Sequence, residues 1–168
     1  RDDESQPAAE LIEVMEEFRW KGKIRYYGCS NWTTSRMKAA DQYCTEKGYR
    51  GFAANQALLN LGYKYMNPLD DDTLVYADEE MQQYHRGHTE NLLMPYMGVC
   101  SGFFHKYLGK GPDAVKDSPY YTDGNLKMAE RVRALCDKYN ATVSQVVLGF
   151  FRQQDFDAVW QNDQAGNG

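Results

Sequence analysis

The chain has 168 residues, of which 42% are hydrophobic and 26% charged, and this balance predicts a globular protein rather than a disordered one. Its net charge of −5 comes from well-mixed charges with no long basic run, which argues against nucleic acid and membrane surfaces as partners. No apolar stretch approaches the roughly 20 residues that a membrane span needs. The four cysteines form no CxxC pair, so we expect buried free thiols and a cytoplasmic location.

Helical signals divide the chain at regular intervals. Residues 5–20 predict an amphipathic helix, with apolar side chains on one stripe at Leu11, Ile12, Met15 and Phe18. A second helix is predicted to start at Thr33 or Thr34 and to end before Gly48. Four more are predicted, at residues 78–86, in a short stretch after Ser101, at residues 125–139 and at residues 142–153. The last of these opens with a Thr-x-x-Gln capping box.

Short apolar segments between these helices predict strands. They cover residues 24–29, 52–59, 92–99 and 156–160, and a long loop over residues 60–76 separates the second strand from the next helix. Apolar strands that alternate with helices indicate an α/β fold with a parallel sheet covered on both faces. Residues 161–168 form a small polar tail that continues none of these patterns.

The carboxyl ends of the predicted strands carry a neutral polar set. Ligands bind at this edge in parallel α/β folds, and it holds Ser30, Asn31, Gln56 and Tyr96, with Asn55 beside them in an otherwise apolar strand. Amides both donate and accept hydrogen bonds, which suits a ligand carboxamide, and a tyrosine ring offers a stacking face. This set could hold a nicotinamide, but it contains no evident catalytic acid, base or nucleophile.

Structural alternatives remain open for each of these residues. Ser30-Asn31 could be a turn that caps the next helix, the strand amides could be buried structural groups, and Tyr96 could be an ordinary core aromatic. His85 and His88 lack further ligands at a recognised metal-site spacing, so we interpret them as solvated residues at a helix end.

Four segments, in the correct order, resemble the aldo-keto reductases. They are GKIRYYGCSNW (22–32), FAANQALLN (52–60), MPYMGVCSGFFHKY (94–107) and SQVVLGFF (144–151). The resemblance extends over residues 1–160 and implies a partial (β/α)8 TIM barrel, about the last four strands with their helices. A complete barrel of this kind needs about 250 residues.

The resemblance also implies a cofactor site. Ser30, Asn31 and Gln56 match positions that hydrogen-bond the nicotinamide carboxamide, and Tyr96 matches the aromatic that stacks on its ring. Val99 and Ser101 match positions along the pyrophosphate, although Met-Gly-Val-Cys replaces the commoner Ser-Pro-Leu-Ala there. NADP(H) is the favoured cofactor, with NAD(H) as the alternative, and no metal is expected.

The resemblance implies an oxidoreductase that reduces aldehydes and ketones with NAD(P)H. The family's four catalytic residues lie upstream of the segment that matches Arg1, and its adenosine-phosphate segment finds no match after residue 160. We therefore expect this chain to need the N-terminal half of a barrel as its partner and to be inactive alone. The alternatives are a non-catalytic cofactor-binding module with a regulatory or interaction role, and an inactive fragment.

Overall fold

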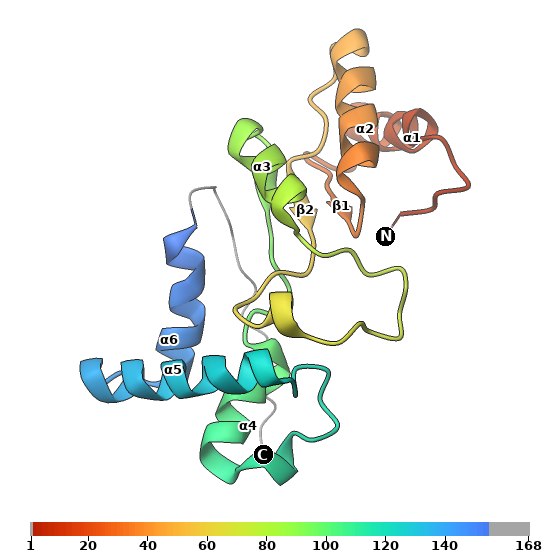
Figure 1. Ribbon diagram of the computed structural model, residues 1–168. Coiled ribbons are helices and arrows are strands. Elements are labelled where there is room, and N and C mark those ends of the chain that lie inside the picture. Colours follow the sequence, from red (N-terminus) through yellow and green to blue (C-terminus); the bar gives the residue numbers. More distant parts are fainter. Residues whose placement is uncertain (1, 155–168) are drawn as a thin grey trace. The chain divides into compact units, whose positions relative to one another are not determined.

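The computed structural model describes residues 2–154 of the chain (Figure 1). These residues form two compact units, one made of residues 2–57 and 73–94 and the other of residues 58–72 and 95–154. The strand predicted at residues 156–160 and the polar tail at 161–168 lie outside the described residues.

A parallel sheet forms the centre of the first unit. Its strands are β1 (Cys29–Ser30), β2 (Ala54–Gln56) and β3 (Leu92–Leu93), in the order β1-β2-β3 with both pairs parallel. The predicted α/β class with parallel strands is therefore confirmed for this part of the chain. Backbone hydrogen bonds continue the pairing beyond the strand ends, from Ala53 N–H to the Tyr27 carbonyl (2.8 Å) and from Met94 N–H to the Asn55 carbonyl (2.8 Å).

All three strands are shorter than the sequence predicted. Residues 24–28 are not strand, and the third strand ends at Leu93 instead of residue 99. Pro95 offers no N–H for a ladder, and Met97 has a left-handed backbone (φ 56°), so regular pairing cannot continue. In the second unit, an isolated parallel bridge pairs Leu58 with Tyr96.

Three helices belong to the first unit: α1 (Ala8–Trp20), α2 (Thr34–Lys47) and α3 (Glu79–Gly87). The predicted limits of α2 are confirmed, because the Thr33 side chain accepts a hydrogen bond from the Arg36 backbone N–H and Gly48 ends the helix with a left-handed φ of 69°. The Asp78 side chain caps α3 in the same way, by accepting from the Met81 N–H at 2.9 Å.

The buried face of α1 differs from the predicted stripe. Ala8, Ile12 and Glu16 are buried, whereas Met15 and Phe18 are 37% and 39% exposed. The difference arises at Glu16, a charged residue with no exposed surface, because Arg19 and Tyr27 both hydrogen-bond its carboxylate. A pattern of apolar residues cannot reveal a carboxylate that is buried with its partners.

The second unit is mainly helical. It contains α4 (Phe103–Lys110), α5 (Asp123–Tyr139) and α6 (Val143–Gly149), with single 3₁₀ turns at Tyr63–Tyr65, Cys100–Gly102, Pro112–Ala114 and Phe150–Gln153. The predicted capping box at Thr142 and Gln145 is present. The helix predicted over residues 142–153 changes to 3₁₀ geometry at Phe150, which shortens α6.

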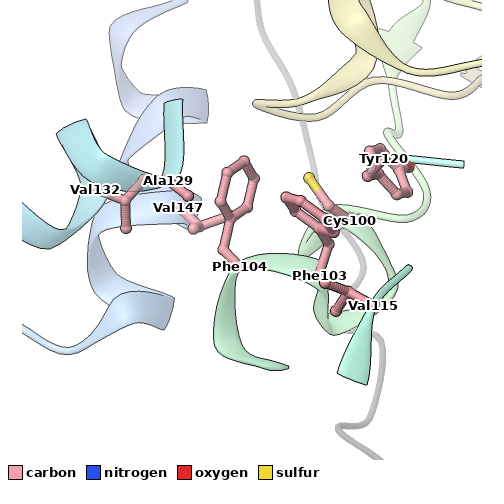
Figure 2. Close-up of a cluster of buried hydrophobic side chains, with 8 residues drawn as sticks. All are labelled: Cys100, Phe103, Phe104, Val115, Tyr120, Ala129, Val132 and Val147. Atoms are coloured by element: carbon pink, nitrogen blue, oxygen red, sulfur yellow. The ribbon is translucent and has the colours of Figure 1, made fainter. Parts of the chain in front are cut away.

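A hydrophobic cluster holds the second unit together (Figure 2). Phe103 and Phe104 of α4 lie at its centre, with their rings edge to face at a centroid distance of 5.2 Å. The remaining buried members are Cys100, Val115, Tyr120, Ala129, Val132 and Val147. Full burial of one of the Val or Phe side chains in this cluster stabilises the fold by about 1.5–3 kcal/mol. Within residues 2–154, no helix has the length and apolar character needed to cross a membrane.

Candidate functional site

The carboxyl ends of β1 and β2 bring two of the predicted site residues together. Ser30 and Gln56 are direct partners in the parallel ladder, and both side chains are partly exposed. The chain then turns at Asn31, whose backbone is left-handed (φ 56°) and whose N–H donates to the Gln56 carbonyl at 2.9 Å. Asparagine tolerates this conformation better than most residues. One hydroxyl and one amide thus lie side by side at the strand ends.

Asn31 does not cap the following helix, because Thr33 fills that role. Its side-chain oxygen instead accepts a hydrogen bond from the Val75 backbone N–H at 3.1 Å, and the residue is only 7% exposed. The side chain therefore connects the end of β1 to the segment that precedes α3. The helix-capping alternative is wrong for Asn31. The side-chain oxygen of Asn31 instead accepts a structural hydrogen bond.

Asn55 is a buried structural amide, as one of the sequence alternatives held. Its side-chain nitrogen lies 3.2 Å from His85 Nε2, and its oxygen accepts a weak hydrogen bond from the Cys29 thiol at 3.5 Å. Consecutive strand residues point to opposite faces of a sheet, so Asn55 faces the interior whereas Gln56 reaches the exposed side.

His85 is buried, contrary to the prediction of a solvated helix end. It is 1% exposed, and its Nδ1 lies 2.7 Å from the Asn91 carbonyl oxygen. A carbonyl only accepts, so Nδ1 carries the proton and Nε2 accepts from Asn55. Burial lowers the pKa of His85. Among the described residues, no group of three or more His, Cys, Asp and Glu side chains is arranged to bind a metal ion.

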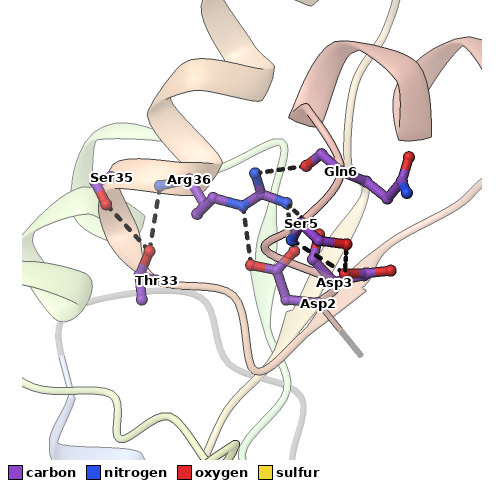
Figure 3. Close-up of polar contacts among 7 residues, drawn as sticks. All are labelled: Asp2, Asp3, Ser5, Gln6, Thr33, Ser35 and Arg36. Atoms are coloured by element: carbon purple, nitrogen blue, oxygen red, sulfur yellow. Dashed lines mark hydrogen bonds and ion pairs between the residues drawn. The ribbon is translucent and has the colours of Figure 1, made fainter.

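Arg36, in the first turn of α2, bonds the segment that precedes α1 (Figure 3). Its guanidinium donates to both carboxylate oxygens of Asp2 at 2.9 and 2.6 Å and to the backbone carbonyl of Gln6 at 3.0 Å. The same group lies 4.8 Å from the centre of the Trp32 ring. Bidentate pairs of this kind are geometrically specific, so the segment before α1 and the beginning of α2 are held in one arrangement.

The remaining predicted site residues belong to the second unit. Tyr96 and Val99 are partly exposed and Ser101 is exposed. Cys100, Ser101 and Gly102 have successive positive φ values of 55°, 52° and 75°, and α4 begins directly after them with no side-chain cap at Gly102. The first amides of α4 therefore follow a left-handed turn that carries Ser101.

Asn60 supports this turn from the interior, and sequence analysis missed it. It has no exposed surface, and its side-chain nitrogen donates to the Met97 carbonyl at 3.0 Å and to the Tyr120 hydroxyl at 2.8 Å. Its oxygen accepts from the Gly62 N–H at 3.0 Å and from the Cys100 thiol at 3.2 Å. The only signal in the sequence was a polar residue at the end of an apolar run.

The thiols near the two sets of site residues are protonated at neutral pH. Burial raises the pKa of Cys29, and burial raises the pKa of Cys100 to about 12. All four cysteines are free, as predicted, but only Cys44 and Cys100 are buried, whereas Cys29 and Cys136 are partly exposed. Neither Cys29 nor Cys100 is a thiolate nucleophile in this structure.

Comparison with known proteins connects this geometry to one family. The sequence model of the aldo/keto reductase family matches residues 1–160. No curated protein sequence is significantly similar to this chain.

Solved structures of the same family share the fold. An aldo/keto reductase from Klebsiella pneumoniae in complex with NADP and acetate has a TM-score of 0.58 and 22% identity, over 95% of this chain and 44% of that one. An aldo-keto reductase of the same organism with NADPH gives a TM-score of 0.56 at 22% identity, with the same coverages of 95% and 44%. A thermostable aldo-keto reductase with the inhibitor epalrestat gives 0.59 at 14% identity, over 97% of this chain and 47% of that one. The chain thus spans less than half the length of these proteins.

Proposed function

This chain belongs to the aldo/keto reductase family, and we propose that it supplies the nicotinamide-binding part of an NADP(H)-dependent reductase of aldehydes and ketones. The proposed architecture is the last four strands of a (β/α)8 barrel, over residues 1–160. Support for the cofactor comes from the family itself and from the Klebsiella pneumoniae structures, which contain NADP or NADPH. NAD(H) is the alternative cofactor, and a cytoplasmic location is part of the same proposal.

One observation carries this proposal: Ser30 and Gln56 are ladder partners at the carboxyl ends of β1 and β2. A hydroxyl and a primary amide on adjacent strands together offer donors and acceptors that match both ends of a carboxamide. Asn31 follows in a left-handed turn that is bonded to the Gln56 carbonyl at 2.9 Å, which keeps the pair in place. These residues fit a nicotinamide carboxamide better than an anion, because the set carries no positive charge.

In the second unit, Tyr96 is proposed to stack on the nicotinamide ring, and Val99 and Ser101 to lie along the pyrophosphate. The left-handed turn at 100–102 leads directly into the N-terminus of α4, where backbone N–H groups are available to an anion. Ser101 has a left-handed backbone (φ 52°), so the turn follows a path that non-glycine residues rarely adopt. Its sequence also differs from the family pattern, with Met-Gly-Val-Cys in place of the commoner Ser-Pro-Leu-Ala.

The cofactor, when bound, supplies the hydride for the carbonyl carbon. The residues of this chain would bind and orient it: Ser30, Asn31 and Gln56 by hydrogen bonds to the carboxamide and Tyr96 by ring contact. The proton for the carbonyl oxygen is proposed to come from the family's catalytic residues, which the resemblance assigns to the N-terminal half of a barrel. The isolated chain would then bind the cofactor without turnover.

A binding experiment with this chain tests the proposal. We expect NADPH to raise the midpoint of thermal unfolding and to bind with a fluorescence change, because a ligand that binds only the folded state stabilises it. Gln56→Met should weaken binding about two- to tenfold, the effect of one lost hydrogen bond. Gln42→Met, on the exposed surface of α2, is the matched control and should bind as the wild type does.

The outcomes separate the candidate functions. No shift with NADPH or NADH, or equal binding by Gln56→Met and wild type, would contradict the proposed site. Turnover of an aldehyde after addition of the N-terminal half of a family member would support a reductase. Binding that persists without turnover in that mixture would favour the alternative, a non-catalytic cofactor-binding module, and an absence of both would favour an inactive fragment.

A further inference from the structure

The turn from Met97 to Gly102 has a backbone that its sequence does not favour. Met97, Cys100 and Ser101 are non-glycine residues with positive φ values of 56°, 55° and 52°. Such conformations are uncommon for side chains of this kind and persist only where the surroundings over-determine them. The backbone hydrogen bonds within the turn, from Cys100 N–H to the Met97 carbonyl (2.8 Å) and from Gly102 N–H to the Val99 carbonyl (3.0 Å), are local.

The Asn60 side chain supplies two buried contacts from outside the turn, and the Lys106 side chain of α4 adds a long one to the Ser101 carbonyl, at 3.5 Å. Its Nδ2 donates to the Met97 carbonyl at 3.0 Å, and its Oδ1 accepts from the Cys100 thiol at 3.2 Å. One amide thus binds the turn at two points, three residues apart. The Met97 carbonyl oxygen accepts two hydrogen bonds, one from the Asn60 side chain and one from the Cys100 backbone N–H, so the Asn60 amide and the backbone of the turn share one acceptor.

Asn60 is itself fixed by the interior of the second unit. Its Nδ2 also donates to the hydroxyl of Tyr120, at 2.8 Å, and its Oδ1 also accepts from the Gly62 N–H at 3.0 Å. Asn60 and Tyr120 both have no exposed surface, and Tyr120 belongs to the hydrophobic cluster. Both donors and both acceptor sites of the amide are therefore in use, and water cannot replace any of them without opening the core.

We propose that Asn60 is the positioning residue that holds the Met97–Gly102 turn in its left-handed path and thereby sets the position of Val99 and Ser101 toward the cofactor. Asn60 does not touch the cofactor, and it acts through the turn. The inference rests on the proposed function for the identity of the ligand, whereas the hold on the turn can be measured without any ligand.

Hydrogen exchange of the full chain followed by NMR tests the hold directly. In the wild type, the side-chain amide protons of Asn60 and the backbone amides of Cys100 and Gly102 should show protection within about tenfold of each other, because they open together. Backbone amides that exchange more than about a hundredfold faster than the Asn60 side chain would overturn the proposal, since the turn would then open while Asn60 stays bound.

A matched pair of variants tests the consequence for binding. Asn60→Ser and Asn125→Ser each change a fully buried asparagine that bonds Gly62, but only Asn60 contacts the turn. Asn60→Ser should lower the protection of the Cys100 and Gly102 amides at least about tenfold and raise the Kd for NADPH about five- to tenfold. Asn125→Ser should lower the overall stability, but the protection of the Cys100 and Gly102 amides and the Kd for NADPH should each stay within about twofold of the wild-type value.

The experiments distinguish a failure of the proposed cofactor-binding function from a failure of the positioning role of Asn60. If the wild type binds no NADPH but the turn amides behave as expected, the proposed function is refuted and the hold of Asn60 on the turn stands. If Asn60→Ser loosens the turn while the Kd for NADPH stays unchanged, or if both variants weaken binding equally, the positioning role is overturned. If Asn60→Ser does not fold, the wild-type exchange experiment still decides whether Asn60 and the turn open together.

Discussion

Removal of one hydroxyl from the interior of the first unit should cost far more than removal of an equivalent hydroxyl from its surface. Tyr27 donates to Glu16 Oε1 at 2.8 Å, and the Glu16 side chain has no exposed surface. Arg19 occupies the other oxygen, Oε2, at 2.6 Å. In Tyr27→Phe the ring still packs edge to face on Phe52 at 5.8 Å, so the variant removes the hydrogen bond and little packing.

The size of the effect follows from the charge and burial of the acceptor. A hydrogen bond to a charged group contributes about 1.5–3 kcal/mol, and a buried acceptor cannot turn to water when its donor is removed. Tyr43→Phe is the matched control: Tyr43 donates to Glu13 Oε1 at 2.6 Å, but Glu13 is partly exposed and also accepts from Tyr49 at 3.2 Å. We expect a loss below about 1 kcal/mol for that variant.

Urea unfolding at 25 °C and pH 7, followed by tryptophan fluorescence, measures both losses. Acidification provides a second test. Burial raises the pKa of Glu16, but the bonds from Arg19 and Tyr27 outweigh it and the net pKa is lowered. The ionised carboxylate therefore stabilises the fold above its unfolded pKa of about 4.3, and this contribution is lost as the pH falls further.

Tyr27→Phe raises the folded pKa of Glu16, so the difference in stability between wild type and variant should narrow below about pH 4.3. Equal losses for Tyr27→Phe and Tyr43→Phe at pH 7, or a loss below about 0.5 kcal/mol for Tyr27→Phe, would refute the reasoning. A difference that grows on acidification would refute the assignment of an ionised Glu16.

Three further substitutions, the first with a control variant, probe the sheet, the core and the buried histidine. Gly28→Ala places a Cβ 2.4 Å from the Ala54 carbonyl oxygen and should cost at least about 1–3 kcal/mol in urea unfolding, whereas Gly109→Ala, with nothing within 4 Å, should be neutral or stabilising. Phe104→Ala empties the centre of the cluster in Figure 2 and should cost about 3–5 kcal/mol, and a loss below about 1 kcal/mol would show that the cluster is not formed. Because burial lowers the pKa of His85 and of His105, the stability of the wild type should fall as the pH drops below about 6.5, and His85→Gln should reduce this slope; an unchanged slope would contradict a buried neutral imidazole at His85.

The parts of the fold that sequence predicted well depend on local chemistry. The Thr33 and Gly48 limits of α2 and the Thr142 capping box were predicted because their signals lie within a few residues of each other. The parts predicted poorly depend on partners that are distant in the sequence. The buried Glu16 is hydrogen-bonded by Tyr27, and the buried His85 is hydrogen-bonded by Asn55, which lies 30 positions away in the sequence. No local sequence pattern predicts either contact.

The candidate site follows the same division. The strand ends at Ser30 and Gln56 were predicted from the rule for parallel sheets, and the ladder places them as partners. Asn60 was missed because its importance arises from the turn that it binds at residues 97–102, which looked like a continuous strand in the sequence. A polar residue at the end of an apolar run has no distinct meaning until its partner is known.

The alternation of Asn55 and Gln56 along β2 has a consequence for the tolerance of the chain to random substitution. The two neighbouring amides lie on opposite faces, one bonded to His85 and the other at the strand ends beside Ser30. In a mutational library, changes at position 55 should deplete variants in a selection for cellular abundance, whereas changes at position 56 should deplete them most strongly in a selection for ligand capture. Adjacent codons would then respond to different selective pressures. A sequence profile that treats positions 55 and 56 as one motif would not separate the requirement for stability from the requirement for ligand binding.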